Sequence, residues 1–384
     1  MSAYLLLALL FLTGFLLARQ KPLWNDEIYS QSAISSLSYR QLVFFQIPEG
    51  NICPLFYVLQ KFLCDAVHYT MPDLWQTESQ ETTRDRYSEI LLRLSPVFFM
   101  SLAMASIFYY FSRFYGWLAG IYSLFLCLSS YMVWEYYAEA RPYALWIFLT
   151  TLQALFFLFI VREKKFSSSS WNALTLIHIL LSLTIVFSVW QILAVTLLLW
   201  IWVDRDWKKC TGLMLVPVVI GLIYFVHSPH YPYWFDLNPG QMIRECFSRD
   251  RLYILLIYGF FLFLYGVQRK FSRLKIFADR SLVEAAPYFC LTVLMLAGAF
   301  LIMLKFKLQE NFQQEGFPVS SRHFIFLTPV GIISTALFSI HLVKGLWKQK
   351  WILLPLAVYI GYLVATRFIK NIPYLEKVWE GFFF

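Results

Sequence analysis

The sequence is poor in charged residues. Asp, Glu, Lys and Arg make up only 14% of its 384 residues, whereas 59% are hydrophobic and 20% are aromatic. So little charge, together with a mean hydropathy of +0.60, excludes an ordinary soluble domain. A helix that crosses a bilayer needs about 20 mostly apolar residues, so a chain of this length has room for roughly a dozen crossings. We therefore expect an all-α polytopic membrane protein with one domain over residues 1–384.

Paired cysteines and metal-binding motifs are also absent. The six cysteines form no CxxC pair and show no spacing with histidine that is typical of a metal site. The polar segments that we assign below to the outside contain no DxD pair and no histidine cluster. We expect the cysteines to be mostly small packing residues. We expect no cofactor, and a divalent metal is the open alternative.

The N-terminal segment and the glycosylation pattern favour a bacterial inner membrane over an endoplasmic reticulum membrane. Residues 3–18 are apolar but are preceded by no basic region and followed by no small-x-small cleavage site, so they predict a retained first helix. The sequence has no Asn-x-Ser/Thr site. Its net charge of +9 indicates Lys and Arg gathered at the cytoplasmic surface rather than a nucleic-acid partner.

Apolar segments of spanning length are abundant, and they predict about eleven transmembrane helices. They lie at residues 3–18, 89–112, 115–133, 142–161, 171–188, 190–203, 211–228, 252–268, 284–304, 323–342 and 351–366. Between the fifth and the sixth, Ser188, Trp190 and Gln191 are the only sign of a turn. A single long helix there would reverse the orientation of every later segment.

The distribution of Lys and Arg orients the predicted helices. With a cytoplasmic N-terminus, all five inside connections after the second, fourth, sixth, eighth and tenth helices carry basic residues, as the positive-inside rule requires. These are Arg113; Arg162, Lys164 and Lys165; Arg205, Lys208 and Lys209; Arg269, Lys270, Arg273, Lys275 and Arg280; and Lys344, Lys348 and Lys350. The segments 19–88, 134–141, 229–250 and 305–322 and the C-terminal tail then lie outside.

The first external loop, residues 19–88, contains short mixed segments typical of interfacial helices. It begins with WNDEIYS, in which Asp26 and Glu27 stand at the membrane boundary, where carboxylates often mark a functional site. Because neighbouring side chains point in different directions, we expect one carboxylate to face a substrate and the other to orient local structure. The alternative is a helix N-terminal pair favoured by the helix dipole.

Two further constellations lie on the same predicted face. YYAEARPYAL places Glu139 and Arg141 in a short outer connection, where the planar guanidinium of arginine suits a phosphate; the alternative is a plain Glu139–Arg141 ion pair. Arg322 and His323 are predicted at the outer start of the tenth helix as ligands; the alternative is an arginine that snorkels to headgroup level. For Arg93, near the outer end of the second helix, we expect structural anchoring.

The ordered set of motifs resembles the GT-C glycosyltransferases of the protein O-mannosyltransferase and aminoarabinose transferase type, related to glycosyltransferase family 39. The segments that carry the resemblance are Asp26, Glu27 and Tyr29; Pro54 and Tyr57; residues 91–96; EARPYAL at 139–145; and RHFIFLTP at 322–329. Where relatives have a His-Pro-Pro or Lys-Pro-Pro, this sequence has Ile52, Cys53 and Pro54. It also lacks the large soluble C-terminal domain of some relatives, so acceptor recognition is expected from the membrane core and external loops.

The resemblance implies a GT-C fold and an inverting glycosyltransferase that moves a sugar from a polyprenyl-phosphate donor to a lipid, glycan or protein acceptor on the non-cytoplasmic face. It implies Asp26 and Glu27 as catalytic residues, with Arg141, Arg322 and His323 at the donor phosphate. Supporting residues would be Tyr29, Tyr57, Glu139 and Tyr143. If the acceptor is itself a phosphate, Asp26 only orients it.

A lipid or solute transporter or flippase is the main alternative function, and a membrane scaffold is the third. Transporters place polar residues and broken helices near the bilayer midplane. The candidate charges of this sequence gather instead at one predicted face, which favours an enzyme at the interface.

Overall fold

The chain is an all-α membrane protein. The computed structural model describes residues 3–21, 23–44, 47, 53–71, 86–164, 167–227, 239–270, 281–311, 321–347 and 350–381. Within these ranges it is helical and has no β-strand. Seven helices of the described chain are long and apolar enough to cross a membrane. They are α5 (Arg86–Tyr115), α8 (Tyr143–Glu163), α11 (Trp207–His227), α13 (Arg249–Lys270), α15 (Ala286–Asn311), α16 (Leu327–Gly345) and α17 (Lys350–Lys370).

The other four predicted segments form shorter helices, so the number of crossings stays a prediction. These are α1 (Ala3–Gln20), α6 (Trp117–Leu128), α9 (Ser168–Ser182) and α10 (Ser188–Trp202). The prediction for residues 115–133 was too long. Gly116 has φ 98°, a conformation that favours glycine, and it separates α5 from α6. After Leu128 the chain turns at Ser129 and Ser130 into the short α7 (Tyr131–Glu135).

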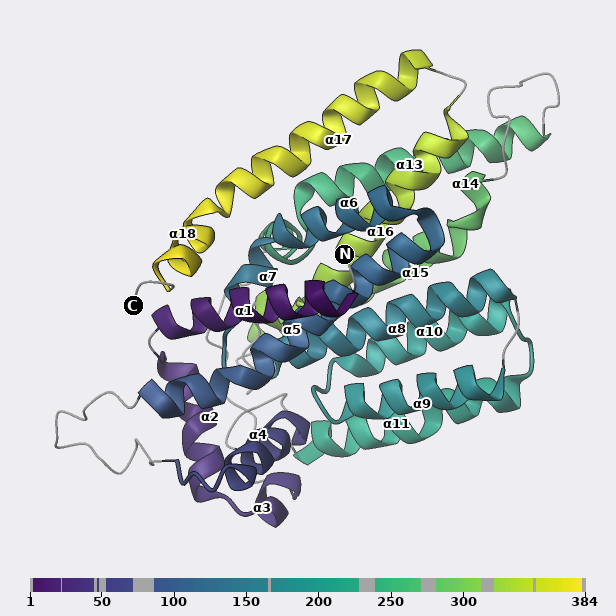
Figure 1. Ribbon diagram of the computed structural model, residues 1–384. Coiled ribbons are helices and arrows are strands. Elements are labelled where there is room, and N and C mark those ends of the chain that lie inside the picture. The colour runs from purple at the N-terminus through teal and green to yellow at the C-terminus, as the bar shows by residue number, and fades with distance from the viewer. Residues whose placement is uncertain are drawn as a thin grey trace.

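α9 and α10 form two separate helices, as the basic loops predict. The turn between them covers Leu183 to Phe187, slightly before the Ser188–Gln191 region expected from the sequence. The two helices run in opposite directions on either side of it (Figure 1). The first external segment packs on this turn, because the backbone N–H of Cys53 donates to the Thr184 carbonyl at 3.3 Å and that of Leu55 to Leu183 at 2.9 Å.

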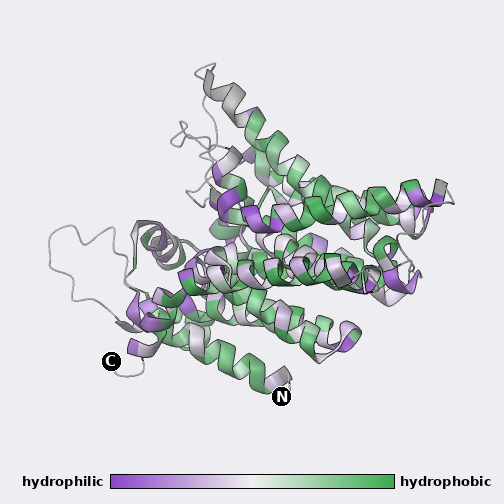
Figure 2. Ribbon diagram, turned by 90° about the horizontal axis from the view of Figure 1, so that it is seen from above, coloured by the Kyte–Doolittle hydropathy of each residue, from purple (hydrophilic) through white to green (hydrophobic). Residues whose placement is uncertain are grey.

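The centre of the bundle is α16. It packs against α6, α8, α13 and α15, and 83% of its apolar stretch is buried. α17 lies at the periphery. Only 17% of its apolar stretch is buried, and Leu354, Val358 and Tyr362 are exposed. Hydrophobic residues run along the helices and hydrophilic residues concentrate toward their ends (Figure 2). This distribution is the one that a hydrocarbon solvent around the helix sides requires.

One end of the bundle carries the short helices of the first predicted external loop. They are α2 (Asn25–Ser36), α3 (Tyr39–Val43) and α4 (Leu55–Ala66), which lie together beyond the ends of α1 and α5 (Figure 1). α4 buries Phe56, Tyr57, Gln60 and Cys64, an i, i+1, i+4, i+8 pattern that forms one helical face. Near this end α18 (Ile372–Glu380) packs on α1. The remaining short elements are α12 (Pro239–Met242), η1 (Ile243–Phe247), α14 (Ser281–Glu284) and η2 (Ser321–Phe324).

Candidate functional site

Glu27 and Arg93 form a fully buried, bidentate ion pair. Arg93 Nε donates to Glu27 Oε1 at 3.0 Å, and Nη2 donates to Oε2 at 2.5 Å. Neither side chain has any exposed surface. The Arg93 Nη1 group also donates to the carbonyls of Ala18, at 3.2 Å, and Lys21. Arg93 on α5 therefore fixes the end of α1 and the start of α2 at the same time.

Glu27 also joins α2 to the connection before α8. Its Oε1 accepts the backbone N–H of Ala140 at 2.7 Å, and its Oε2 accepts the N–H of Trp24, the N-cap residue of α2, at 3.3 Å. A carboxylate at the third position of a helix commonly satisfies the N-cap amide in this way. Because both oxygens of Glu27 are engaged, this carboxylate orients the surrounding backbone.

Asp26 points to a different partner. Its Oδ2 forms an ion pair with Nη1 of Arg322 on η2. The two side chains are 21% and 20% exposed, so this pair, unlike Glu27 and Arg93, is accessible to solutes. The Arg322 guanidinium also lies over the Trp24 ring, 5.8 Å from its centroid. Adjacent residues on a helix point about 100° apart, which explains why the neighbouring carboxylates have separate partners.

Arg141 lies beside the same turn of α2. Its side chain is only 4% exposed, and Nη1 donates to the Asp26 carbonyl at 3.2 Å and to Ser30 Oγ at 3.4 Å. The guanidinium lies 5.8 Å from the centroid of the Tyr143 ring on α8. Asp26, Arg141 and Arg322, which come from three separate sequence motifs, are thus brought together at the N-terminus of α2.

Glu139 is buried in the connection between α7 and α8, with 2% of its surface exposed. Burial raises the pKa of its carboxyl from the ordinary 4.5 to about 8; nearby Glu27 acts in the same direction, while Lys21, Arg141 and Arg322 oppose it. Among the described residues, its Oε1 has no hydrogen-bond partner. Burial therefore favours the neutral form of the Glu139 carboxyl beside the neighbouring arginines.

The other predicted site residues lie in three places. His323 belongs to the 3-10 turn η2 rather than to the tenth helix, because α16 begins only at Leu327. Its side chain is 5% exposed and its ring packs edge-on against Phe187, with centroids 5.8 Å apart. Tyr29 on α2 is exposed, whereas Tyr57 on α4 is fully buried and packs against Phe56.

An apolar groove of about 240 Å³ opens beside η2. Phe187, Trp190, Leu222 and Phe225 help to line it, and Lys305 is the only charged residue among the described residues of the lining. Phe187 connects the groove to the site, since its ring contacts both His323 and Phe324. The Lys305 ammonium lies 5.6 Å from the Phe225 centroid. The groove thus combines an apolar wall with a single cation.

Sequence reasoning assigned Arg93 to anchoring but did not identify Glu27 as its partner. The available signal was an arginine inside an apolar helix, which generally requires a buried counter-charge. Trp24 and Ser30 were also missed as neighbours of the arginines. Within the described ranges, no three His, Cys, Asp or Glu side chains are grouped so as to hold a metal ion.

The chain was also compared with known proteins. No protein-family model matches it, and no curated protein matches it either. The chemical argument therefore depends on the geometry. Arg322 is paired with the Asp26 carboxylate and Arg141 lies beside the Asp26 backbone, whereas Arg93 is paired with Glu27. This arrangement is partly shielded from water, and its guanidinium groups can hold an anion beside the Asp26 carboxylate.

Proposed function

We propose that the protein is a membrane glycosyltransferase of the GT-C type, which transfers a sugar from a polyprenyl phosphate to a lipid, glycan or protein acceptor. The observation that carries the proposal is the convergence of Asp26, Arg141 and Arg322 at the start of α2. A sugar transfer of this kind requires a proton acceptor next to a phosphate-binding group, and these three side chains supply both.

Arg141 and Arg322 are the proposed ligands of the leaving phosphate. When the glycosidic C–O bond breaks, its electron pair goes to the phosphate oxygen, so negative charge increases there. Fixed guanidinium groups stabilise that charge best in a site that excludes bulk water. The burial of Arg141 and the low exposure of Arg322 supply such surroundings. One guanidinium has five N–H donors, so Arg322 can contact Asp26 and a phosphate together.

Asp26 is the proposed general base. The acceptor hydroxyl or amine attacks the anomeric carbon from the face opposite to the phosphate, which inverts that centre, and Asp26 takes the proton as the new bond forms. Glu27 is a positioning residue in this scheme, since its oxygens are held by Arg93, Ala140 and Trp24. If the acceptor is a phosphate, no proton needs to be removed and Asp26 orients the acceptor.

The apolar groove next to His323 fits the isoprenoid tail of such a donor. Its Phe187 wall contacts the turn that carries Arg322, so a chain in the groove would bring its phosphate toward the arginines. Lys305 in the groove lining adds a further positive charge for a lipid phosphate. His323, Tyr143 and Glu139 would then border the donor, and the acceptor would come from the side of α2, where Tyr29 is exposed.

Sugar transfer by the purified full-length protein tests the proposal. The protein is reconstituted in liposomes and supplied with a panel of polyprenyl-phosphate hexoses and pentoses. Candidate acceptors are identified by mass spectrometry, which compares the lipids and glycans of cells that have the gene with those of cells that lack it. We expect the wild type to release polyprenyl phosphate and form a glycosylated product, with Asp26→Asn reducing the rate.

The matched control is Asp65→Asn on α4, which changes one carboxylate of the same external segment outside the site. Asp65 accepts a hydrogen bond from the Tyr39 hydroxyl at 2.5 Å and lies near the surface. This variant should transfer sugar like the wild type. If Asp26→Asn transfers sugar at the wild-type rate, Asp26 is not the general base. Transport of an intact lipid-linked sugar without any transfer would favour the flippase alternative.

A further inference from the structure

A second charged pocket is lined in part by η1 and lies apart from the residues of the candidate site. It has a volume of about 280 Å³ and is lined by residues of α6, α7, η1, α13, α16 and α17. No residue of the Asp26, Arg141 and Arg322 group lines it. The volume far exceeds the ~10–15 Å³ that one ordered water needs, so the pocket has room for a chemical group of several atoms.

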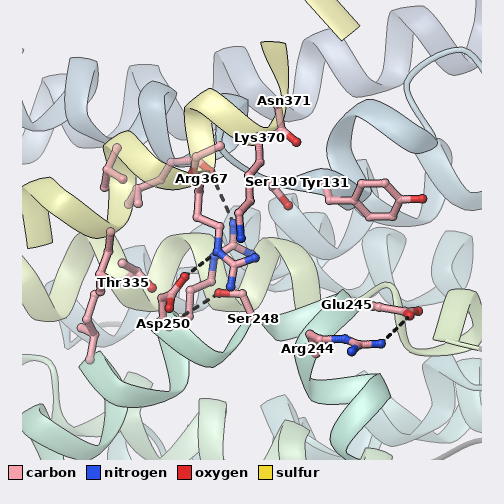
Figure 3. A pocket seen from close by; sticks show the side chains of 16 residues that line it. Ser130, Tyr131, Arg244, Glu245, Ser248, Asp250, Thr335, Arg367, Lys370 and Asn371 are labelled. Carbon is pink, nitrogen blue, oxygen red and sulfur yellow. Dashed lines mark hydrogen bonds and ion pairs between the residues drawn. The ribbon is translucent and has the colours of Figure 1, made fainter. Parts of the chain in front are cut away.

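Four cations and two carboxylates line this pocket. The cations are Arg244, Arg251, Arg367 and Lys370, and the carboxylates are Glu245 and Asp250. Arg367 Nε contacts Asp250 Oδ2 at 2.5 Å, and Arg244 Nη2 lies 3.8 Å from Glu245 Oε1. Figure 3 shows Arg367 and Lys370 extending from α17 into the space beside Asp250 and Ser248. The pocket therefore has a net positive charge of two.

Arg251 is the decisive residue, because only 6% of its surface is exposed. Within the described chain its side chain makes one hydrogen bond, to the Leu126 carbonyl at 3.4 Å, and no ion pair. A buried guanidinium is strongly destabilised unless its donors and its charge are matched. Its remaining N–H groups line a pocket in which Lys370 also has no ion-pair partner among the described residues, which indicates that an anion completes the site.

The surroundings select the kind of anion. Leu126, Ile254, Leu363 and Val364 make part of the pocket wall, and the last two belong to α17. Lys370 stands at the end of that same helix. A lipid phosphate between the four cations would therefore have the apolar part of its headgroup region against these side chains.

We propose that this pocket binds the phosphate of an anionic lipid headgroup. Arginine and lysine donors around a partly buried cavity match phosphate oxygens, and the apolar walls match the glycerol and upper acyl region. The inference does not rest on sugar transfer, since it uses a different set of residues. It assigns this pocket to a bound lipid.

Lipid binding to the purified full-length protein in detergent tests this proposal. Native mass spectrometry measures the occupancy of phosphatidylglycerol and phosphatidylcholine, and added inorganic phosphate or glycerol 3-phosphate competes for the site. We expect phosphatidylglycerol to bind more tightly than phosphatidylcholine. The double variant Arg367→Gln/Lys370→Gln should weaken phosphatidylglycerol binding by about tenfold or more, as the loss of charge-assisted hydrogen bonds predicts. Arg251→Gln should weaken it similarly.

Matched variants separate this result from general effects. Lys377→Gln on α18 removes one exposed cation outside the pocket and should leave phosphatidylglycerol binding unchanged. If Arg251→Gln fails to fold, the double variant, whose side chains are more exposed, decides alone. Competition by inorganic phosphate as strong as that by lipid would assign the site to a free phosphate. Equal binding of phosphatidylglycerol to all variants would overturn the proposal.

Discussion

Asp26 and Arg322 are 296 positions apart in the sequence, yet their side chains form an ion pair at the first turn of α2. The pair sits at the meeting point of the first external segment and the turn before α16. A carboxylate and a guanidinium held this close, and both partly exposed, form a unit whose two members have opposite chemical tasks in the proposed reaction. The tasks can be separated by substituting each member alone.

Donor binding and turnover should respond differently to the two substitutions. Asp26→Asn removes the proton acceptor but leaves Arg141 and Arg322, so the Kd for polyprenyl phosphate should stay the same or fall. Turnover should fall about 10²- to 10⁴-fold with a hydroxyl acceptor. Arg322→Gln should weaken polyprenyl-phosphate binding as well as turnover, because its charge meets phosphate before and during bond cleavage. Equal losses of binding in both variants would contradict this division.

The Glu27–Arg93 pair should dominate the stability of the external end. Arg93→Leu leaves the buried Glu27 carboxylate without its partner, and such a change costs about 3–5 kcal/mol. We expect a large drop in melting temperature in detergent, and the double variant Glu27→Leu/Arg93→Leu should recover part of it. Lys209→Gln, which breaks a solvent-exposed ion pair with Asp204, is the control and should melt like the wild type.

Glu139 should make stability depend on pH. Its folded pKa of about 8 exceeds the ordinary 4.5 of an unfolded glutamate, because burial disfavours the charged carboxylate. Between these values the folded chain keeps a proton that the unfolded chain has lost. Stability should therefore fall as the pH rises from 5 to 8, by up to about 1.4 kcal/mol per pH unit.

The Glu139→Gln variant isolates this contribution, because its amide is neutral throughout. Melting temperatures of both proteins, measured in detergent between pH 5 and pH 9, should show the steeper decline in the wild type. The difference between the two curves should level off above pH 8, where Glu139 is ionised in both states. Parallel curves over the whole range would show that Glu139 is charged in the folded protein.

Labelling of single introduced cysteines checks the orientation. Lys164, between α8 and α9, and Lys377, on α18, are both exposed. In intact cells, a membrane-impermeant maleimide should modify Lys377→Cys but not Lys164→Cys, which should react only after permeabilisation. The native cysteines are buried or partly buried, so the unmodified protein gives the background signal. The reverse pattern would place Asp26, Arg141 and Arg322 on the cytoplasmic side.

Hydropathy alone locates the helices well, since each of the eleven predicted segments contains one. The period and length of an apolar run are local properties, so they can be read from the sequence. The ends of the helices are harder to predict from the sequence. Gly116 ends α5 by adopting φ 98°, and Arg322 lies in the 3-10 turn η2 ahead of α16. Both features depend on backbone conformations that hydropathy does not record.

The candidate site was predictable in its residue types but not in its pairing. Asp26, Arg141 and Arg322 stand out as charges at the ends of apolar segments. Which of the two neighbouring carboxylates meets Arg93 depends on the rotation of α2 about its axis, and tertiary packing sets that rotation. The pocket around Arg251 was not predicted, because its cations come from η1, α13 and α17 and no local motif links them.

The connections of Glu27 also constrain the order in which the protein is built. Its partners Arg93 and Ala140 follow it by 66 and 113 residues. At a synthesis rate of about 5–20 residues per second, Glu27 waits several seconds before either is available. An unpartnered carboxylate stays in water during that time. α2 can therefore dock only after α5 and the segment before α8 have been inserted, and the end of the bundle that holds Asp26 matures after the helices that support it.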